Sequence, residues 1–400
     1  GSITLDDSSA EAATGNLAMT AGQRILLTKT DDGIDNLDAG STLTAGSGNL
    51  ALNAGSGIQL DSASSGIASG SVAANTTVGD LTIIDESSLT ATDGNMNLDA
   101  GNDVVVTNGS NATASGDMTM TAGQNVTVQN GSQATAKGGL TANAKAGDLK
   151  VDSGSGLTAT EGNMNLDAGN DVVVISGSTA TANGDMAMNA GQDVTVQYGS
   201  QATAKGDLTA NAKTGDLKVD SGSGLTATEG NMNLDAGNDV VVISGSTATA
   251  NGDMKMTAGQ SVTVQYGSQA TAKEDLTANA KAGDLKVDSG SGMTATEGNM
   301  NLDAGNDIVV ISGSTATANG DMTMTAGQNV TVQYGSQATA KEDLTANAKT
   351  GDLKVDSGSE LTATEGNMNL DAGNGVEVAD SRLTAGDGMT VDAVEAGITL

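Results

Sequence analysis

The residues best placed for chemistry are aspartates that recur at one position of a repeated segment, immediately before a short apolar run. The four that define the pattern are Asp171, Asp193, Asp216 and Asp239. If the segments stack in register, these carboxylates lie about 4.8 Å apart in a column. Carboxylates that close repel one another, which raises their pKa or recruits a cation. One interpretation is therefore a column that binds calcium.

A second interpretation gives the same aspartates a structural role. The AGND string at residues 168–171 is only partly similar to calcium-binding nonapeptide repeats, because their paired glycines and nine-residue period are missing. Asn125, Ser261 and Asn329 also occupy the aspartate position in other segments. An aspartate that caps its own turn tolerates such replacements. We therefore expect turn capping and no metal or cofactor, with calcium as the alternative.

Three tyrosines are the only aromatic residues, and they too recur at one position. Tyr198, Tyr266 and Tyr334 are evenly spaced along the sequence, one in each of three successive repeat units. With three turns per unit, a regular stack places them roughly 14 Å apart along one corner. Exposed tyrosines in a row can stack on sugars and would form a glycan-binding ridge. Because Asn130 and Ser176 stand at the equivalent position, we expect instead corner residues that pack over their neighbours.

No catalytic residue is predicted from this set. The chain has no His and no Cys, which removes imidazole bases, thiol nucleophiles and the common zinc ligand sets. Parallel β-helices include polysaccharide lyases and glycosidases, which need a carboxylate pair or a Lys or Arg base in a cleft. Arg24 and Arg382 are far apart, and the acidic residues of the regular part exist in near-identical copies. Such copies on a flat face form no singular pocket, so we do not expect an enzyme.

The elements that position these residues follow from an internal repeat of constant length. An LTAT or MTAT string begins, at equal intervals, at Leu89, Leu157, Leu225, Met293 and Leu361. Within one such unit the opening G-[ND]-[ML] recurs at Gly162, Gly184 and Gly206. A period near 22 without a helix signal is typical of a solenoid, in which each turn covers the apolar face of the next.

Each turn is predicted to hold three short strands. In the turn that begins at Gly162 these are residues 164–168, 172–175 and 179–182, with Met, Leu, Val and Ala pointing inward at alternate positions. Residues 169–170 and 176–178 form corners, because they accept positive φ or cap the backbone locally. The fold class is thus all-β, a triangular parallel β-helix (β-solenoid) with three strands per turn of about 22 residues.

The third turn of each unit is a variant with two additional residues. In the unit of residues 162–229 we place them near Gly215 and Glu229, at corners where insertions are tolerated. Lysines cluster on this type of turn, where we expect them to relieve charge between turns. Lys205, Lys213 and Lys218 are one such set.

No linker or break in composition interrupts the repeat, so one continuous solenoid of roughly seventeen turns is predicted. Residues 1–93 form degenerate N-terminal turns with a loop excursion near 29–42, residues 94–365 carry the regular three-turn repeats, and residues 366–400 form degenerate C-terminal turns. In the degenerate N-terminal turns the predicted inward residues are Leu50, Leu52, Ile58, Leu60, Ile67, Leu81, Ile83 and Leu89. Because neither end carries a polar capping segment, we also expect end-to-end self-stacking.

Charge and hydropathy disfavour several classes of partner. The net charge of −33 argues against nucleic acid and against anionic membranes. No apolar run reaches the roughly 18 residues of a membrane span. Without Cys, a secreted chain of this kind draws its stability from ladder hydrogen bonds and stacking.

Three strings carry a family resemblance: GNLAMTAGQ at residues 15–23, GDMTMTAGQNVTVQNGSQATA at 116–136 and GDLTANAKTGDLKV at 206–219. They resemble the haemagglutinin-type repeats of filamentous-haemagglutinin-like proteins, the exported adhesins of bacterial two-partner secretion, which include the stalks of contact-dependent inhibition toxins. The shared pattern is G-[ND]-[LM]-x-[LM]-x-A-G-x-[DN]-[VI]-x-[VI], and it covers nearly the whole chain. The resemblance implies a right-handed β-helix, export through an outer-membrane partner transporter, and an extracellular place on the bacterial surface.

The expected function is that of a structural shaft in a virulence-associated adhesin or toxin-delivery filament. It would project a distal segment from the cell, and segments outside this chain would bind a host or bacterial receptor. The alternative is that the shaft itself is a multivalent adhesin for glycan or matrix.

Overall fold

The structure, a computed structural model, describes residues 1–29 and 40–400. These residues form strands, turns and bends, with no helix among them. Accordingly, none of the described residues belongs to a helix that could cross a membrane. The predicted all-β class is confirmed, whereas most of the loop excursion predicted near 29–42 lies outside the described residues.

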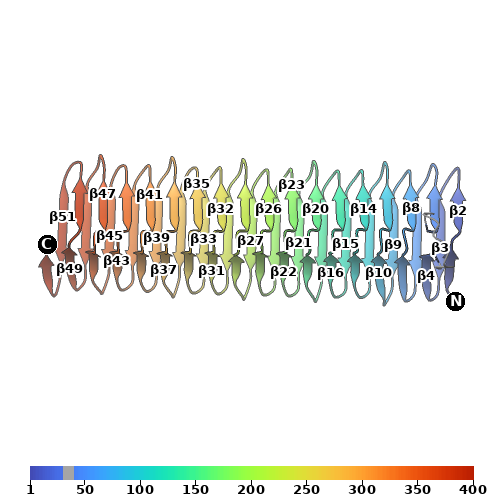
Figure 1. Cartoon of the computed structure of the whole chain (residues 1–400), viewed down its shortest axis with the longest axis horizontal. Coiled ribbons are helices and arrows are strands. Elements are labelled where there is room, and N and C mark those ends of the chain that lie inside the picture. Colours follow the sequence, from blue (N-terminus) through green and yellow to red (C-terminus); the bar gives the residue numbers. More distant parts are fainter. Residues whose placement is uncertain (30–39) are drawn as a thin grey trace. The chain divides into compact units, whose positions relative to one another are not determined.

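The chain divides into two compact units, residues 1–192 with 200–205 and residues 193–199 with 206–400. Each unit is a parallel β-solenoid in which every complete turn adds one strand to each of three sheets, called A, B and C in chain order. Within each unit, the strands of successive turns lie side by side (Figure 1). The described residues make about 17 turns in all. The predicted parallel β-solenoid with three strands per turn is thus confirmed.

The strands of the first unit fall into three sheets. Sheet A contains β1 (Ile3–Asp6), β4 (Arg24–Thr28), β7 (Gly57–Leu60), β10 (Asp80–Ile83), β13 (Val104–Val106), β16 (Val126–Val128), β19 (Leu149–Val151) and β22 (Val172–Ile175). Sheet B contains β2 (Ser9–Ala12), β5 (Thr42–Ala45), β8 (Ser65–Ala68), β11 (Ser88–Ala91), β14 (Asn111–Ala114), β17 (Gln133–Ala136), β20 (Gly156–Ala159), β23 (Thr179–Ala182) and β26 (Gln201–Ala204). Sheet C contains β3 (Leu17–Ala21), β6 (Leu50–Ala54), β9 (Val72–Thr76), β12 (Met96–Ala100), β15 (Met118–Ala122), β18 (Leu140–Ala144), β21 (Met164–Ala168) and β24 (Met186–Ala190).

The strands of the second unit follow the same plan. Sheet A contains β25 (Val194–Gln197), β28 (Leu217–Val219), β31 (Val240–Ile243), β34 (Val262–Gln265), β37 (Leu285–Asp288), β40 (Ile308–Ile311), β43 (Val330–Gln333), β46 (Leu353–Asp356), β49 (Gly375–Ala379) and β52 (Gly397–Thr399). Sheet B contains β29 (Gly224–Ala227), β32 (Thr247–Ala250), β35 (Gln269–Ala272), β38 (Gly292–Ala295), β41 (Thr315–Ala318), β44 (Gln337–Ala340), β47 (Glu360–Ala363) and β50 (Arg382–Ala385). Sheet C contains β27 (Leu208–Ala212), β30 (Met232–Ala236), β33 (Met254–Ala258), β36 (Leu276–Ala280), β39 (Met300–Ala304), β42 (Met322–Ala326), β45 (Leu344–Ala348), β48 (Met368–Ala372) and β51 (Met389–Ala393).

The core is built from alternate residues of each strand. The predicted strands at 164–168, 172–175 and 179–182 coincide with β21, β22 and β23. Parallel pairing places like residues on one another, so that Met232 pairs with Met254 and Leu234 with Met256. Each large apolar side chain buried in this way contributes about 1.5–3 kcal/mol. Stacking therefore creates columns of Met, Leu, Val and Ala in place of an aromatic core.

The two additional residues of the variant turn lie where they were predicted. Between β27 and β28 the corner has four residues, 213–216, whereas the corner between β33 and β34 has three, 259–261. Between β29 and β30 the corner is residues 228–231, against 251–253 between β32 and β33. The strands keep their register because the corners absorb the difference.

One predicted inward residue is wrong. Ile67 is 40% exposed, and β8 instead buries Gly66 and Ala68. The side chain of Leu89 in the next turn fills the space above Gly66, since a Cβ atom there would lie 2.6 Å from Leu89 Cδ1. Ile67 therefore faces outward, opposite Thr90 of β11. The other residues predicted to point inward are buried: Leu50, Leu52, Ile58, Leu60, Leu81, Ile83 and Leu89.

The corner between sheets A and B uses left-handed backbone, as predicted. Ser176 has φ of 59° and Gly177 has φ of 71°. Gly169, in the corner between sheets C and A, serves another purpose: a Cβ atom there would lie 2.6 Å from the carbonyl oxygen of Lys145. Three-residue corners of this kind need glycine at this position, because adjacent turns approach too closely for a side chain.

A glutamine side chain lies over a glycine of the next turn in sheet B, once in each three-turn repeat. In the first unit, the side chain of Gln133 occupies the space left open by Gly156, and Thr179 Oγ1 lies on the far side of that space. Gln269 and Gly292 form the same arrangement in the second unit. Along this row the outward position is therefore taken in turn by a long side chain (Gln), by no side chain (Gly) and by a short one (Thr).

Candidate functional site

The predicted aspartate column forms a hydrogen-bonded ladder. In the second unit the Asp216 N–H donates to Asp193 Oδ1 at 2.8 Å, and the Asp239 N–H donates to Asp216 Oδ1 at 3.1 Å. In the first unit the Asp171 N–H donates to Asp148 Oδ1 at 3.4 Å. The aspartates thus cap the backbone of the following turn, whereas we expected each to cap its own turn.

Residues that replace aspartate in this column accept the same hydrogen bond from the following turn. Asn125 Oδ1 accepts a hydrogen bond from the Asp148 N–H at 2.9 Å, and Asn329 Oδ1 accepts one from the Asp352 N–H at 2.9 Å. Ser261 Oγ is also an acceptor for the following turn. The position therefore requires an acceptor oxygen rather than a charge. Within residues 1–29 and 40–400, no group of three or more acidic side chains is arranged to hold a metal ion, and calcium binding here stays an untested prediction.

A second ladder, which the sequence analysis missed, runs along the corner between sheets B and C. The Asp253 N–H donates to Asn231 Oδ1 at 2.8 Å, and the Asp275 N–H donates to Asp253 Oδ1 at 3.0 Å. Asn299 continues it through its N–H to Asp275 Oδ1 at 2.8 Å. The sequence signal was the Asn or Asp in each opening G-[ND]-[ML] string.

A third ladder, also missed, is buried at the corner between sheets A and B. The Ser246 N–H donates to Ser268 Oγ at 3.1 Å, and the Ser268 N–H donates to Ser291 Oγ at 3.2 Å. These serines are at most 2% exposed. The recurrence of Ser directly after the corner glycine could have revealed it.

The tyrosines lie at the same corner, on its outer side. Tyr198, Tyr266 and Tyr334 are all in the second unit, are 60–61% exposed and have φ of 56°. Ser221 and Ser244 occupy the equivalent position in neighbouring turns, with φ of 58° and 59°. With most of each side chain open to solvent, packing over neighbours does not account for these residues.

The outer face of sheet A borders the tyrosine corner. Next to Tyr266, Gln265 pairs with Ile243 of the preceding turn and with Asp288 of the following turn. Lys286 Nζ lies 3.0 Å from Asp288 Oδ2, and Gln265 Nε2 donates to the same oxygen at 3.3 Å. Along this strip, three successive turns therefore present an apolar side chain, an amide and an ion-paired carboxylate.

Burial and ion pairing act against each other on these aspartates. Burial raises the pKa of Asp288, but hydrogen bonds from Lys286 and Ser312 together with the lysine charge outweigh it, and the pKa lies below its usual value. Asp220 is shifted in the same direction, with burial opposed by Lys218 and Ser244. Both carboxyl groups are thus held in their charged form.

The lysines of the variant turn do not act as one group. Lys218 Nζ lies 3.0 Å from Asp220 Oδ2 on the same turn. Pairing between turns is seen at another position, where Lys273 Nζ lies 3.9 Å from Glu297 Oε2, with both side chains exposed. Charge relief between turns, which we expected for the whole cluster, therefore involves only some of its positions.

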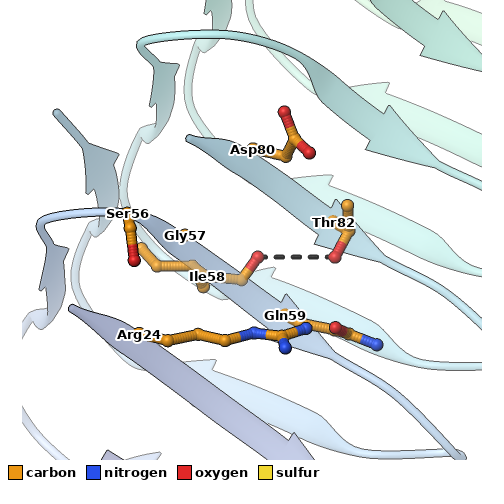
Figure 2. Close-up of a pocket in the computed structure, with 7 residues that line it drawn as sticks. All are labelled: Arg24, Ser56, Gly57, Ile58, Gln59, Asp80 and Thr82. Atoms are coloured by element: carbon orange, nitrogen blue, oxygen red, sulfur yellow. Dashed lines mark hydrogen bonds between the residues drawn. The ribbon is translucent and has the colours of Figure 1, made fainter. Parts of the chain in front are cut away.

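A hollow of about 250 Å³ lies on sheet A of the first unit (Figure 2). Gly57 of β7 pairs with Arg24 of β4 on one side and with Asp80 of β10 on the other. Gly57, which has no side chain, therefore lies between a positively and a negatively charged residue. Thr82 Oγ1 donates to the Ile58 carbonyl oxygen at 3.4 Å across the hollow. Such a surface could hold a small polar molecule.

Another hollow, of about 320 Å³, lies at the corner between sheets C and A in the second unit. Lys281, Lys349, Gly305 and Gly327 are among the residues that line it. Asp303 also lines it and accepts a hydrogen bond from Asn279 Nδ2 at 3.2 Å. The hollow exists because two glycines separate lysines in this column.

Comparison with family models, with curated proteins and with solved structures found no match for this chain. The resemblance to filamentous-haemagglutinin-like adhesins therefore depends on the repeat motifs alone.

Proposed function

We propose that this chain is the structural shaft of a large exported bacterial surface protein, an adhesin or a toxin-delivery filament. In this function the solenoid projects a distal segment from the cell. Export through an outer-membrane transporter and the place on the cell surface come from the motif resemblance.

The observation that carries the proposal is that three-turn units are interchangeable. Met232 pairs with Met254 in one unit, and Met300 pairs with Met322 in the same way in the next. Every unit thus presents the same strands and ladders to its neighbour. The number of units can therefore change without any change in local contacts, which suits a spacer of adjustable reach.

Deletion of residues 230–297 tests this interchangeability. It removes one complete three-turn unit and joins Glu229 to Gly298, which restores the native junction. We expect an intact fold that is shorter by roughly 14 Å, or three turns. Circular dichroism checks the fold and small-angle X-ray scattering measures the length. A chain that unfolds after this deletion would contradict the spacer function.

The cellular location needs its own test. Antibodies against this chain should label intact cells of the organism that makes it, and external protease should remove the signal. Labelling only after the cells are made permeable would contradict export. The outcome is independent of the deletion experiment.

A further inference from the structure

The three tyrosines have a backbone conformation that disfavours bulky side chains. Tyr198, Tyr266 and Tyr334 have φ of 56°, in the left-handed region where such residues are uncommon. Ser244 and Ser289, at the same corner, have nearly the same φ, of 59° and 58°. The corner therefore forms readily with serine, and tyrosine is the less favourable choice for the backbone.

Burial does not compensate for this choice. The tyrosines are 60–61% exposed, so most of the surface of each residue is open to solvent. A residue that strains the backbone and gains little packing is typical of a functional position. Three such residues at the same place in successive three-turn repeats strengthen this argument.

The surface beside Tyr266 combines apolar and polar groups. In the turn before Tyr266, half-buried Val241 and Ile243 project from β31 on the outer face of sheet A, and Ile243 pairs with Gln265, the residue before Tyr266. The Lys286–Asp288 ion pair lies on β37, in the turn that follows Tyr266. An aromatic side chain with an apolar strip suits the C–H face of a sugar ring. Amide, ammonium and carboxylate groups can bind its hydroxyls.

The arrangement repeats with the three-turn period. Tyr334 follows Gln333, which pairs with Ile311 of the preceding turn, as Gln265 pairs with Ile243. Successive tyrosines are three turns apart, roughly 14 Å. A polymer can reach several of them at once, and linked contacts raise a weak affinity. The net charge of −33 repels polyanions, which favours an uncharged polymer.

We propose that Tyr198, Tyr266 and Tyr334 form a row of binding sites for a neutral polysaccharide chain. This binding surface does not depend on the shaft function, because it requires only the second unit as it is folded.

Affinity electrophoresis tests the proposal, with the whole chain run through gels that contain a soluble β-glucan, a galactomannan or a dextran. We expect at least one of these polymers to retard the chain. A variant with all three tyrosines changed to Ser should bind at least tenfold more weakly. Serine is the matched replacement, since it occupies this corner in neighbouring turns. A variant with all three changed to Phe should keep the binding, because the ring remains.

Tyrosine fluorescence gives a second readout, because the chain has 3 Tyr and no Trp. The polymer that retards the chain should change the emission. Short oligosaccharides of the same sugar, which reach one tyrosine only, should bind at least tenfold more weakly than the polymer.

Several results would overturn the proposal. These are no retardation by any of the three neutral polymers, equal retardation of the Tyr→Ser variant, or retardation by polygalacturonate alone. Unchanged circular dichroism of the variants would show that lost binding does not come from lost fold.

Discussion

Side-chain oxygens of Asp, Asn and Ser hold the corners of this solenoid together. At the corner between sheets C and A, Asp216 accepts a hydrogen bond from Asp239, and Asn329 accepts one from Asp352. A carboxylate and an amide are equivalent there, because only one acceptor oxygen is used. Hydrogen bonding to the following turn is therefore the role that the structure shows for the acidic column at this corner.

Substitution at Asp216 separates hydrogen bonding from charge. Asp216→Asn keeps the acceptor and should leave stability nearly unchanged, whereas Asp216→Ala leaves the Asp239 N–H without its partner and should cost about 1 kcal/mol. Hydrogen exchange of the Asp239 amide measures the local effect. If Asn were as harmful as Ala, charge and not hydrogen bonding would be the requirement.

The ion-paired aspartates predict how stability depends on pH. The pKa values of Asp220 and Asp288 are lowered in the folded chain. A carboxyl group whose pKa is lowered by folding stabilises the fold at pH values above its pKa in the unfolded chain, which is close to 3.8. This contribution is lost as the pH falls through the lowered pKa of the folded chain. Thermal melts at decreasing pH should therefore show the loss of this contribution, which acts against the relief of repulsion as other carboxylates are protonated. In the Lys286→Met variant Asp288 lacks its ion pair, so its contribution to the loss of stability at low pH should be smaller. A pH profile equal to that of the unmodified chain would contradict this role of the ion pair.

Strands and corners of this solenoid have different sequence requirements. Strands tolerate Met, Leu, Val, Ile or Ala at inward positions, because each stacks on a similar residue above and below. The corner between sheets C and A is more restrictive, since a Cβ atom at Gly327 would overlap the carbonyl oxygen of Gly305. Glycine at this corner therefore allows neighbouring turns to stack closely.

Two glycine substitutions distinguish close approach from backbone conformation. Gly327→Ala forces neighbouring turns apart and should cost on the order of 1–3 kcal/mol. Gly313→Ala meets no atom within 4 Å but has φ of 71°, so it should cost about 1–2 kcal/mol for conformation alone. Only the first should increase hydrogen exchange in the preceding turn as well as in its own. Equal exchange patterns in the two variants would contradict this distinction.

At the scale of the whole molecule, charge opposes folding. The chain carries a net charge of −33, and its successive turns are about 4.8 Å apart. That spacing is shorter than the Debye length of about 10 Å at 0.1 M salt. Repulsion between turns therefore destabilises the folded state at low ionic strength.

Added salt should consequently raise the melting temperature. Sodium chloride titrations followed by circular dichroism measure the effect, and a fall in melting temperature would show that attractive ion pairs dominate. Calcium and magnesium chloride at equal ionic strength provide the control. A much larger rise with calcium would support the calcium column that we regard as the alternative.

The sequence by itself determined the class of fold, the strands and the place of the insertions. The alternation of Met164, Leu166 and Ala168 with polar residues, repeated in every regular turn, permits only one inward face. Period and alternation are local properties, so they can be read from the chain without coordinates. Where alternation was weak, as around Ile67, hydrophobicity alone selected the wrong face.

Only the tertiary structure decided what the corner residues do. An Asp beside a glycine can cap its own turn or the next one, and the choice depends on how closely turns stack. The Ser246–Ser268 ladder and the exposure of Tyr266 depend in the same way on contacts between residues more than twenty positions apart. Such contacts exist only after the turns have stacked, which is why the sequence alone did not reveal them.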